Sequence, residues 1–247
     1  MRVACLGPRG TFTHMAAERL YPGASTVFVQ THADAVLSCA RLETDAFVAA
    51  LSNSVADYIG PTVQALLSDE ARGLRIDRGT VSLVSFSLYR PPQAGALKVV
   101  YSHPAALAQV GDWLRRSGAR AVETDSTVAA LALIALEGDS ATGAVGPAGL
   151  GPEYGLDEVE VRLEGESRNQ TRFIGGAREA PLEEAARYLV RVRDAADIRA
   201  RLAEVGEVHL AGRRGEYRLF ELVGGPSLAA VRAALADTGE VIGAYGF

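Results

Sequence analysis

RVACLGPRGTFTHMAAERL, residues 2–20, contains the unit from which most of this chain is built. RVACL (2–6) predicts a buried strand, and GPRGT (7–11) predicts a turn. Thr13 is placed to cap a helix that continues to Leu20. A strand that leads through a short turn into a helix is the repeating element of α/β proteins, so this stretch predicts an α/β fold.

The same alternation recurs as far as about residue 178. Pro91, Pro92 and Gly95 interrupt it, at a point where the chain can cross between two lobes. Further strands are expected at 46–51, 81–89, 97–102, 120–124, 141–146, 159–164 and 169–176. Further helices are expected at 33–42, from Pro61, at 103–116 with Ser102 as cap, and at 127–137 with Asp125 or Ser126 as cap and Gly138 as stop. The pattern favours layered α/β structure with largely parallel strands.

After a linker, AREAPLEEA, the chain changes character. Strands are predicted for YLVRV, EVHLAGR, EYRLFELV and GEVIGAYGF, with helices at 195–204 and 226–237. The order βαββαβ is that of the ferredoxin-like fold, a sheet with its helices on one face. Such topology does not by itself establish a function, although the apolar strand YRLFELV could serve as an edge for dimerisation.

Composition argues against several classes of protein. The chain is 48% hydrophobic and 22% charged, with a formal net charge of -5 and no long run of one sign, which disfavours nucleic-acid partners. Neither a signal peptide nor a membrane-spanning stretch is evident, so Cys5 and Cys39 are expected to be reduced, buried thiols in a cytoplasm. We expect no metal, because the histidines are scattered singly, as His14, His32, His103 and His209.

Four strand-to-helix turns carry small or hydroxyl residues. Exposed N–H groups and the dipole at a helix start favour anions there, although Ser, Thr and Gly are also ordinary residues of such connections. The turns are GPRGT (7–11), SNS (52–54), YSHP (101–104) and TDST (124–127). GPRGT lacks the third glycine of a dinucleotide motif and the lysine of a phosphate loop, so no dinucleotide cofactor is predicted.

NQTRF (169–173) is the last distinctive segment before the linker. Alternation along a strand places Thr171 and Phe173 on one face and Arg172 on the other. Arg172 can grip a carboxylate with two parallel hydrogen bonds, or it can form a surface or interdomain salt bridge. The residues alone leave both interpretations open.

In combination these segments resemble the prephenate dehydratase family over most of residues 1–175. The resemblance rests on GPRGTFTHMAA, SNSVADYI, YSHPAALAQ, TDSTVAALA and NQTRF, in that order. It implies a catalytic domain over 1–178 with two α/β lobes, similar to periplasmic binding proteins, the second lobe covering about 80–165. It also implies a ferredoxin-like ACT domain over 185–247, with a regulatory or dimerisation role.

The implied activity is conversion of prephenate to phenylpyruvate, carbon dioxide and water, as in phenylalanine biosynthesis, without a cofactor. Thr171 would assist departure of the ring hydroxyl and Arg172 would hold a carboxylate. Asn53, Ser102 and Gln109 match further catalytic positions. The substrate-binding positions are Thr11, Ser52, Ser54, His103, Ser126, Thr127 and Phe173. His103 can instead be a structural hydrogen-bonding residue at the start of its helix.

The chain also departs from the family pattern. Ser52 stands where the motif Pro-Ile-Glu-Asn-Ser has its glutamate, and Asp57 stands where a glycine is expected. Ser52 could alter substrate choice or rate, or act only as a cap. In the C-terminal region, 194–196 and 210–213 differ from the segments that bind phenylalanine in ACT domains, which argues against phenylalanine as effector while leaving another amino acid open.

Three functions follow from these observations. The first is prephenate dehydratase, acting as a homodimer or homotetramer. The second is a relative that decarboxylates prephenate, or a similar acid, without aromatising it, for which Ser52 and Asp57 are the motive. The third is a non-catalytic protein that binds small molecules. Retention of Thr171 favours the first over the second, because a donor aimed at the hydroxyl is of little use if the hydroxyl stays.

Overall fold

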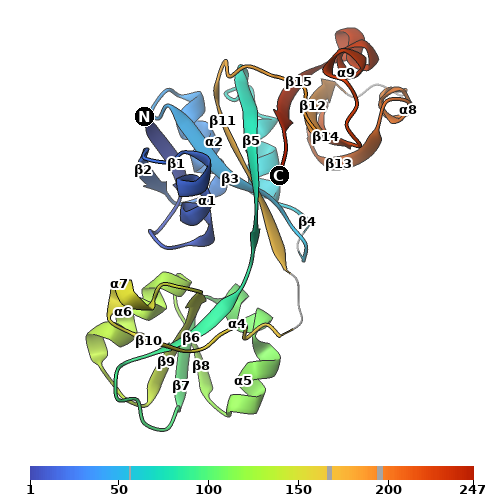
Figure 1. Ribbon diagram of the computed structural model, residues 1–247. Helices are drawn as coiled ribbons and strands as arrows, with labels where there is room; N and C mark the ends of the chain where they lie inside the picture. The colour runs from blue at the N-terminus through green and yellow to red at the C-terminus, as the bar shows by residue number, and fades with distance from the viewer. Residues whose placement is uncertain (56, 166–168, 194–196) are drawn as a thin grey trace. The chain divides into compact units, whose positions relative to one another are not determined.

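The computed structural model describes residues 1–55, 57–165, 169–193 and 197–247 (Figure 1). The chain divides into two compact units. The first comprises Met1–Gly7, Thr13–Ser82 and Gln170–Phe247, and the second comprises Pro8–Phe12 and Leu83–Asn169. Each unit is built on a sheet of its own, and both sheets contain parallel and antiparallel pairs. The predicted α/β class is therefore confirmed.

Parallel strands and three helices make up the N-terminal part of the first unit. They are β1 (Arg2–Leu6), β2 (Ser25–Val29), β3 (Ala46–Asn53), α1 (Phe12–Leu20), α2 (His32–Ala40) and α3 (Gly60–Leu66). β1 pairs in parallel with both β2 and β3. Helix α1 begins at Phe12, so Thr13 lies inside it and the predicted cap is wrong. Cys5 and Cys39 are buried free thiols, and burial raises their pKa values to about 12 and about 11.

Strand β11 (Gln170–Arg178) lies antiparallel against β3 and brings the NQTRF segment into this sheet. Beyond it come β5 (Leu74–Leu83) and the strands of the C-terminal region, in the order β13-β14-β12-β15-β5-β11-β3-β1-β2. The short strand β4 (Asp57–Tyr58) pairs with the end of β3. Gly176 is needed where β11 meets β5, since a Cβ there would collide with the carbonyl of Arg75 and the ring of Phe47.

The C-terminal region has the predicted order βαββαβ. Its elements are β12 (Arg187–Arg193), α8 (Ile198–Ala203), β13 (Glu207–Arg214), β14 (Tyr217–Val223), α9 (Leu228–Leu235) and β15 (Gly239–Tyr245). Helices α8 and α9 lie together against one face of these strands, as Figure 1 shows, around Val190, Phe220 and Leu222. Strand β14 lies between β13 and β12, so YRLFELV is not an edge strand and that expectation is wrong. The prediction concerning 194–196 lies outside the described residues.

The opposite face of this region packs on the N-terminal part. Leu189 of β12 and Leu219 of β14 belong to the same buried cluster as Val63 and Leu66 of α3. One sheet and one core thus run from the N-terminal strands into the C-terminal region. Burial of these apolar side chains, at about 25 cal/mol per Å², gives the contact a hydrophobic stabilisation of its own.

The second unit contains the sheet β10-β6-β9-β7-β8. Its elements are β6 (Phe86–Arg90), β7 (Val99–Ser102), α4 (Pro104–Gln109), α5 (Gly111–Ser117), β8 (Arg120–Glu123), α6 (Thr127–Glu137), β9 (Thr142–Pro147), α7 (Gly151–Tyr154) and β10 (Asp157–Glu160). The helix predicted at 103–116 is divided at Val110. The strand predicted at 159–164 ends at Glu160, and the strand predicted at 81–89 is broken between β5 and β6. No helix among the described residues is long and apolar enough to cross a bilayer.

His32, at the start of α2, gives the first unit a predictable dependence on pH. Its Nδ1 accepts a hydrogen bond from the Ala50 amide at 3.4 Å, and burial lowers its pKa from 6.5 to about 4. The unfolded chain therefore binds a proton more readily between these two values, and stability is lost as the pH falls from 6.5 toward 4. Over this pH range we expect the free energy of unfolding of His32→Asn to decrease by about 1–2 kcal/mol less than that of the wild type. Urea unfolding at several pH values measures this. Identical losses in the two proteins would show that His32 does not contribute.

Candidate active site

Thr171 and Asn53 form a side-chain pair across the β3–β11 ladder of the first unit. The two residues are direct partners in register, and Asn53 Nδ2 donates to Thr171 Oγ1 at 2.8 Å. The other end of the amide is fixed as well, because Asn53 Oδ1 accepts from the Val55 amide at 2.9 Å. A threonine hydroxyl that accepts one hydrogen bond still has its own hydrogen to donate. The pair thus offers an oriented, uncharged proton donor.

The strand around Thr171 has the alternation that the sequence predicted. Thr171 and Phe173 are buried, with 8% and 1% exposure, whereas Arg172 is only partly buried. A register shift between Arg172 and Phe173 marks a bulge, a feature that redirects side chains in a strand. Phe173 belongs to the core of the sheet, while Thr171 and Arg172 before it present polar groups. Its place in substrate binding stays a prediction.

Ser54 and Asp57 shape the end of β3. Ser54 Oγ accepts from the amide of Gln170 at 2.9 Å, and the amide of Ser54 donates to the carbonyl of Gln170 at the same distance. Asp57 has a φ of 57°, in the left-handed region that favours glycine, and it forms β4 with Tyr58 opposite Asn53 and Ser52. Asp57 therefore occupies a backbone conformation for which the expected glycine is well suited.

Arg172 is held from two sides. Its Nε donates to Ser52 Oγ at 2.5 Å, and its Nη1 donates to both carboxylate oxygens of Glu221, at 2.8 and 2.9 Å. The rings of Tyr58 and Phe247 lie 5.6 Å from its guanidinium carbon. Of the two interpretations open for Arg172, the structure contains the salt bridge, while 22% of the side chain stays exposed. Ser52 is an acceptor for Arg172 and not a helix cap.

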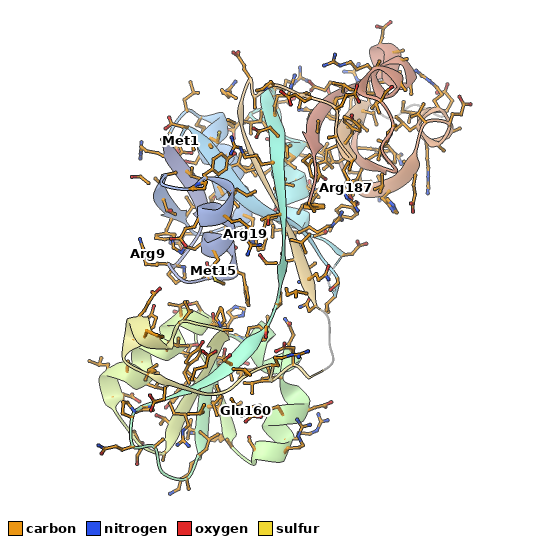
Figure 2. All side chains as sticks on the ribbon, viewed as in Figure 1. Met1, Arg9, Met15, Arg19, Glu160 and Arg187 are labelled. Carbon is orange, nitrogen blue, oxygen red and sulfur yellow. The ribbon has the colours of Figure 1, made fainter. Side chains whose placement is uncertain are left out.

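Glu221 is the centre of this cluster. Only 1% of its side chain is exposed, and it accepts from Tyr58 at 2.5 Å, from Tyr245 at 2.8 Å and from Arg187 at 3.3 Å in addition to Arg172. Arg187, labelled in Figure 2, extends from β12. Burial alone would raise the pKa of Glu221, but the hydrogen bond from Tyr58 and the charge of Arg172 hold that pKa below its usual range.

Sequence reasoning missed Glu221 and its two tyrosine partners. One signal was present: along YRLFELV the alternation of faces places Glu221 between Leu219 and Val223, in a strand that is otherwise almost entirely apolar. A carboxylate in such a place is expected to have a buried cationic partner. The partner itself could not be chosen from the pattern.

In the second unit, the helix cap that was predicted for Ser102 is provided by His103. Ser102 is fully buried at the end of β7 and donates to the carbonyl of Val145 at 2.6 Å, so it does not cap the following helix. The cap is His103, whose Nδ1 accepts from the Ala105 amide at 3.2 Å. The structural alternative for His103 is thus present. Ser102 is committed to the sheet.

Gln109 and Asn169 form a polar side-chain pair in the second unit. Asn169 is 3% exposed, and its Nδ2 donates to Gln109 Oε1 at 2.6 Å. Gln109 is the last residue of α4, while Asn169 immediately precedes β11. The carbonyl of Asn169 also accepts from the amide of Val84 at 2.8 Å. This pair holds the end of α4 against the residue that precedes β11.

The remaining predicted residues lie at turns of the second unit. Ser126 caps α6, as expected, by accepting from the Ala129 amide at 2.9 Å, and Thr127 is the first residue of that helix. Thr11 Oγ1 donates to the carbonyl of Pro8 at 3.0 Å. The structure thus gathers Ser52, Asn53, Ser54, Thr171, Arg172 and Phe173 around β3 and β11. Ser102, His103 and Gln109 lie along β7 and α4.

Comparison with known proteins identifies the family. The model of the family described as prephenate dehydratase matches residues 3–180. The bifunctional chorismate mutase/prephenate dehydratase of Neisseria gonorrhoeae is 31% identical over 179 residues, which cover 70% of this chain and 49% of the relative. The chain spans about half the length of the first curated relatives that it matches.

Solved structures agree in fold. A prephenate dehydratase from Arthrobacter aurescens superposes with a TM-score of 0.82 at 24% identity, over 100% of this chain and 90% of the other. A protein described as a novel type of quorum quenching acylase superposes with a TM-score of 0.77 at 23% identity, over 99% and 97% of the two chains. The similarity to these structures establishes the fold alone, whereas the match to the family model extends over more than half of the sequence. The chain belongs to the prephenate dehydratase family.

Proposed function

We propose that this chain is a prephenate dehydratase, which converts prephenate to phenylpyruvate, carbon dioxide and water. The observation that carries the proposal is the Asn53–Thr171 pair, a fixed hydroxyl donor on the strand that also holds Arg172. Family membership and the names of the curated relatives support the same activity. A neutral donor beside a cation suits a dianionic substrate that must lose a hydroxyl group.

In the proposed mechanism the ring carboxylate leaves as carbon dioxide, and its bonding electrons expel the ring hydroxyl as the ring becomes aromatic. Thr171 donates a hydrogen bond to the departing oxygen as negative charge develops there, and the hydroxide that leaves takes up one proton from solvent to become water. Asn53 orients Thr171, because Asn53 Nδ2 donates to Thr171 Oγ1, the hydroxyl oxygen whose own hydrogen is donated to the substrate. Arg172 holds a substrate carboxylate by its positive charge.

We infer that the C-terminal region, 185–247, is an ACT-like domain that follows a catalytic domain over 1–178, with a second lobe over about 80–165. Its βαββαβ order supports this assignment. The related structure from Arthrobacter aurescens is described as a complex with L-Phe. Because 210–213 departs from the expected segment, phenylalanine is not proposed as an effector here. A homodimer or homotetramer is proposed, with β13 at the end of the sheet order as an available edge.

The alternative that prephenate is decarboxylated without aromatisation rested on Ser52 and Asp57. Two observations argue against this alternative. Glu221 supplies Arg172 with the carboxylate that position 52 lacks, and Asp57 adopts the left-handed conformation that suits the expected glycine. The Asn53–Thr171 pair also argues for loss of the hydroxyl. We therefore propose the dehydratase in preference to this relative and to a binding protein without catalysis.

The deciding experiment is incubation of the purified chain with prephenate, with chromatographic identification of the product. Phenylpyruvate formed by the wild type, and much more slowly by Thr171→Ala, is the expected result. A non-aromatic product would establish the second activity. Absence of turnover would instead favour a binding protein without catalysis.

His103→Asn is expected to keep kcat within about three-fold of the wild type, because asparagine is a good helix cap and the histidine acts through its cap bond. His103→Ala should lower the free energy of unfolding by about 1 kcal/mol. Steady-state kinetics and thermal unfolding of both variants test this. A loss of kcat above about 100-fold in a folded His103→Asn protein would give the imidazole a part in proton transfer.

A further inference from the structure

We infer that Glu221, in the C-terminal region, is a positioning residue for Arg172 of the proposed active site, and that it provides the carboxylate that position 52 lacks. This inference rests on the proposed function, since it assigns the residue that orients the substrate-binding arginine. Glu221 lies on β14 and Arg172 on β11, and their contact spans 49 residues of sequence. The carboxylate is therefore supplied by a segment beyond the matched family region, which ends at residue 180.

The geometry favours orientation of the guanidinium over a general contribution to stability. Nε is fixed by Ser52 Oγ, and Nη1 is fixed by both oxygens of Glu221, so the plane of the guanidinium is defined by two separate partners. Ser52 cannot balance the charge of Arg172, because a hydroxyl is neutral. Glu221 balances it while leaving the side chain 22% exposed for a ligand.

Glu221 is itself immobilised. Tyr58 and Tyr245 donate to its two oxygens from β4 and β15, and only 1% of its side chain is exposed. Tyr58 pairs with Ser52 through β4, so the two partners of Arg172, Glu221 and Ser52, are held by the same short strand. One residue of the C-terminal region thus fixes the position of Arg172.

The test moves the carboxylate to the other side of Arg172. In the full-length chain, Glu221→Ser should raise the KM for prephenate about 20-fold with kcat within about three-fold, as expected for loss of a hydrogen bond to a charged group that binds substrate. Glu221→Gln, which keeps the shape, should act in the same direction and guards against a folding failure. The exchange variant Ser52→Glu/Glu221→Ser should restore KM to within about three-fold of the wild type.

Glu216→Ser is the matched control, because Glu216 pairs with Arg193 at 3.1 Å beside the same strand but is 56% exposed. Its KM should equal that of the wild type. A folded Glu221→Gln protein with unchanged KM would overturn the inference, as would an exchange variant that folds and shows no recovery. Rescue by a relocated carboxylate is not expected of a residue that only stabilises the fold.

A second readout separates this inference from the proposed function. If the wild type itself does not convert prephenate, the reaction of Arg172 with phenylglyoxal can be followed by mass spectrometry. Glu221→Gln should accelerate that reaction at least about five-fold, because the guanidinium is released, and the exchange variant should return it to the rate of the wild type. Equal rates in all three proteins would show that Glu221 does not hold Arg172.

Discussion

Thr171→Ala is expected to lower kcat for prephenate about 100-fold while KM stays within about three-fold of the wild type. The hydroxyl accepts from Asn53 at 2.8 Å, and in the proposed mechanism it donates its own hydrogen to the departing oxygen of the substrate. That oxygen gains charge only as the bond breaks, so the lost interaction belongs to the transition state. Steady-state kinetics on the folded variant measures both constants.

Thr171→Ser is the matched control, because it retains the hydroxyl and removes one methyl group. We expect it to keep kcat within about ten-fold, with any loss reflecting the freer rotation of serine. Thr171 is 8% exposed, so the methyl group also contributes to packing, and thermal unfolding should accompany the kinetics. Full activity of Thr171→Ala would remove the hydroxyl from the mechanism. A rise in KM alone would assign Thr171 to substrate binding.

Elements that depend on local chemistry could be predicted from the sequence. β1 begins and ends where RVACL does, and Ser126 caps α6 with Gly138 at its end, because turn and cap preferences act over a few residues. The caps assigned to Thr13 and Ser102 were wrong. Helix α1 begins one residue before Thr13, and Ser102 uses its hydroxyl inside the sheet, in a bond to the carbonyl of Val145, so that the next residue, His103, caps α4.

The candidate site itself was only partly predictable. The resemblance supplied Asn53 and Thr171, which lie 118 residues apart, but their hydrogen bond follows from the register of β3 and β11. Glu221 could not be assigned at all. Its position in an apolar strand signals a buried partner, whereas the choice of Arg172 depends on how β14 reaches β11 across the core that surrounds α3.

Arg172→Ala is expected to lower the free energy of unfolding by about 3 kcal/mol at pH 7, in addition to weakening substrate binding. Glu221 would remain buried with Arg187, Tyr58 and Tyr245, but without its closest cation. Removing one partner of a buried pair is costly because the other charge keeps its desolvation penalty. Urea unfolding at several pH values measures the effect. The control is Arg193→Ala, which removes a 65% exposed partner of Glu216 and should leave the free energy of unfolding nearly unchanged.

The pH dependence distinguishes this cause from a simple loss of packing. In the wild type the pKa of Glu221 lies below its usual range, so the stability that it contributes is present at neutral pH and is lost as the pH falls through that depressed pKa. Without Arg172 the pKa of Glu221 should rise, because burial then outweighs the remaining donors. The variant accepts a proton at higher pH, and its deficit relative to the wild type should shrink as the pH falls from 7 toward 4. A deficit that is constant over this range would mean that Arg172 stabilises the fold through its aliphatic stem and its aromatic neighbours, and not through the charge of Glu221.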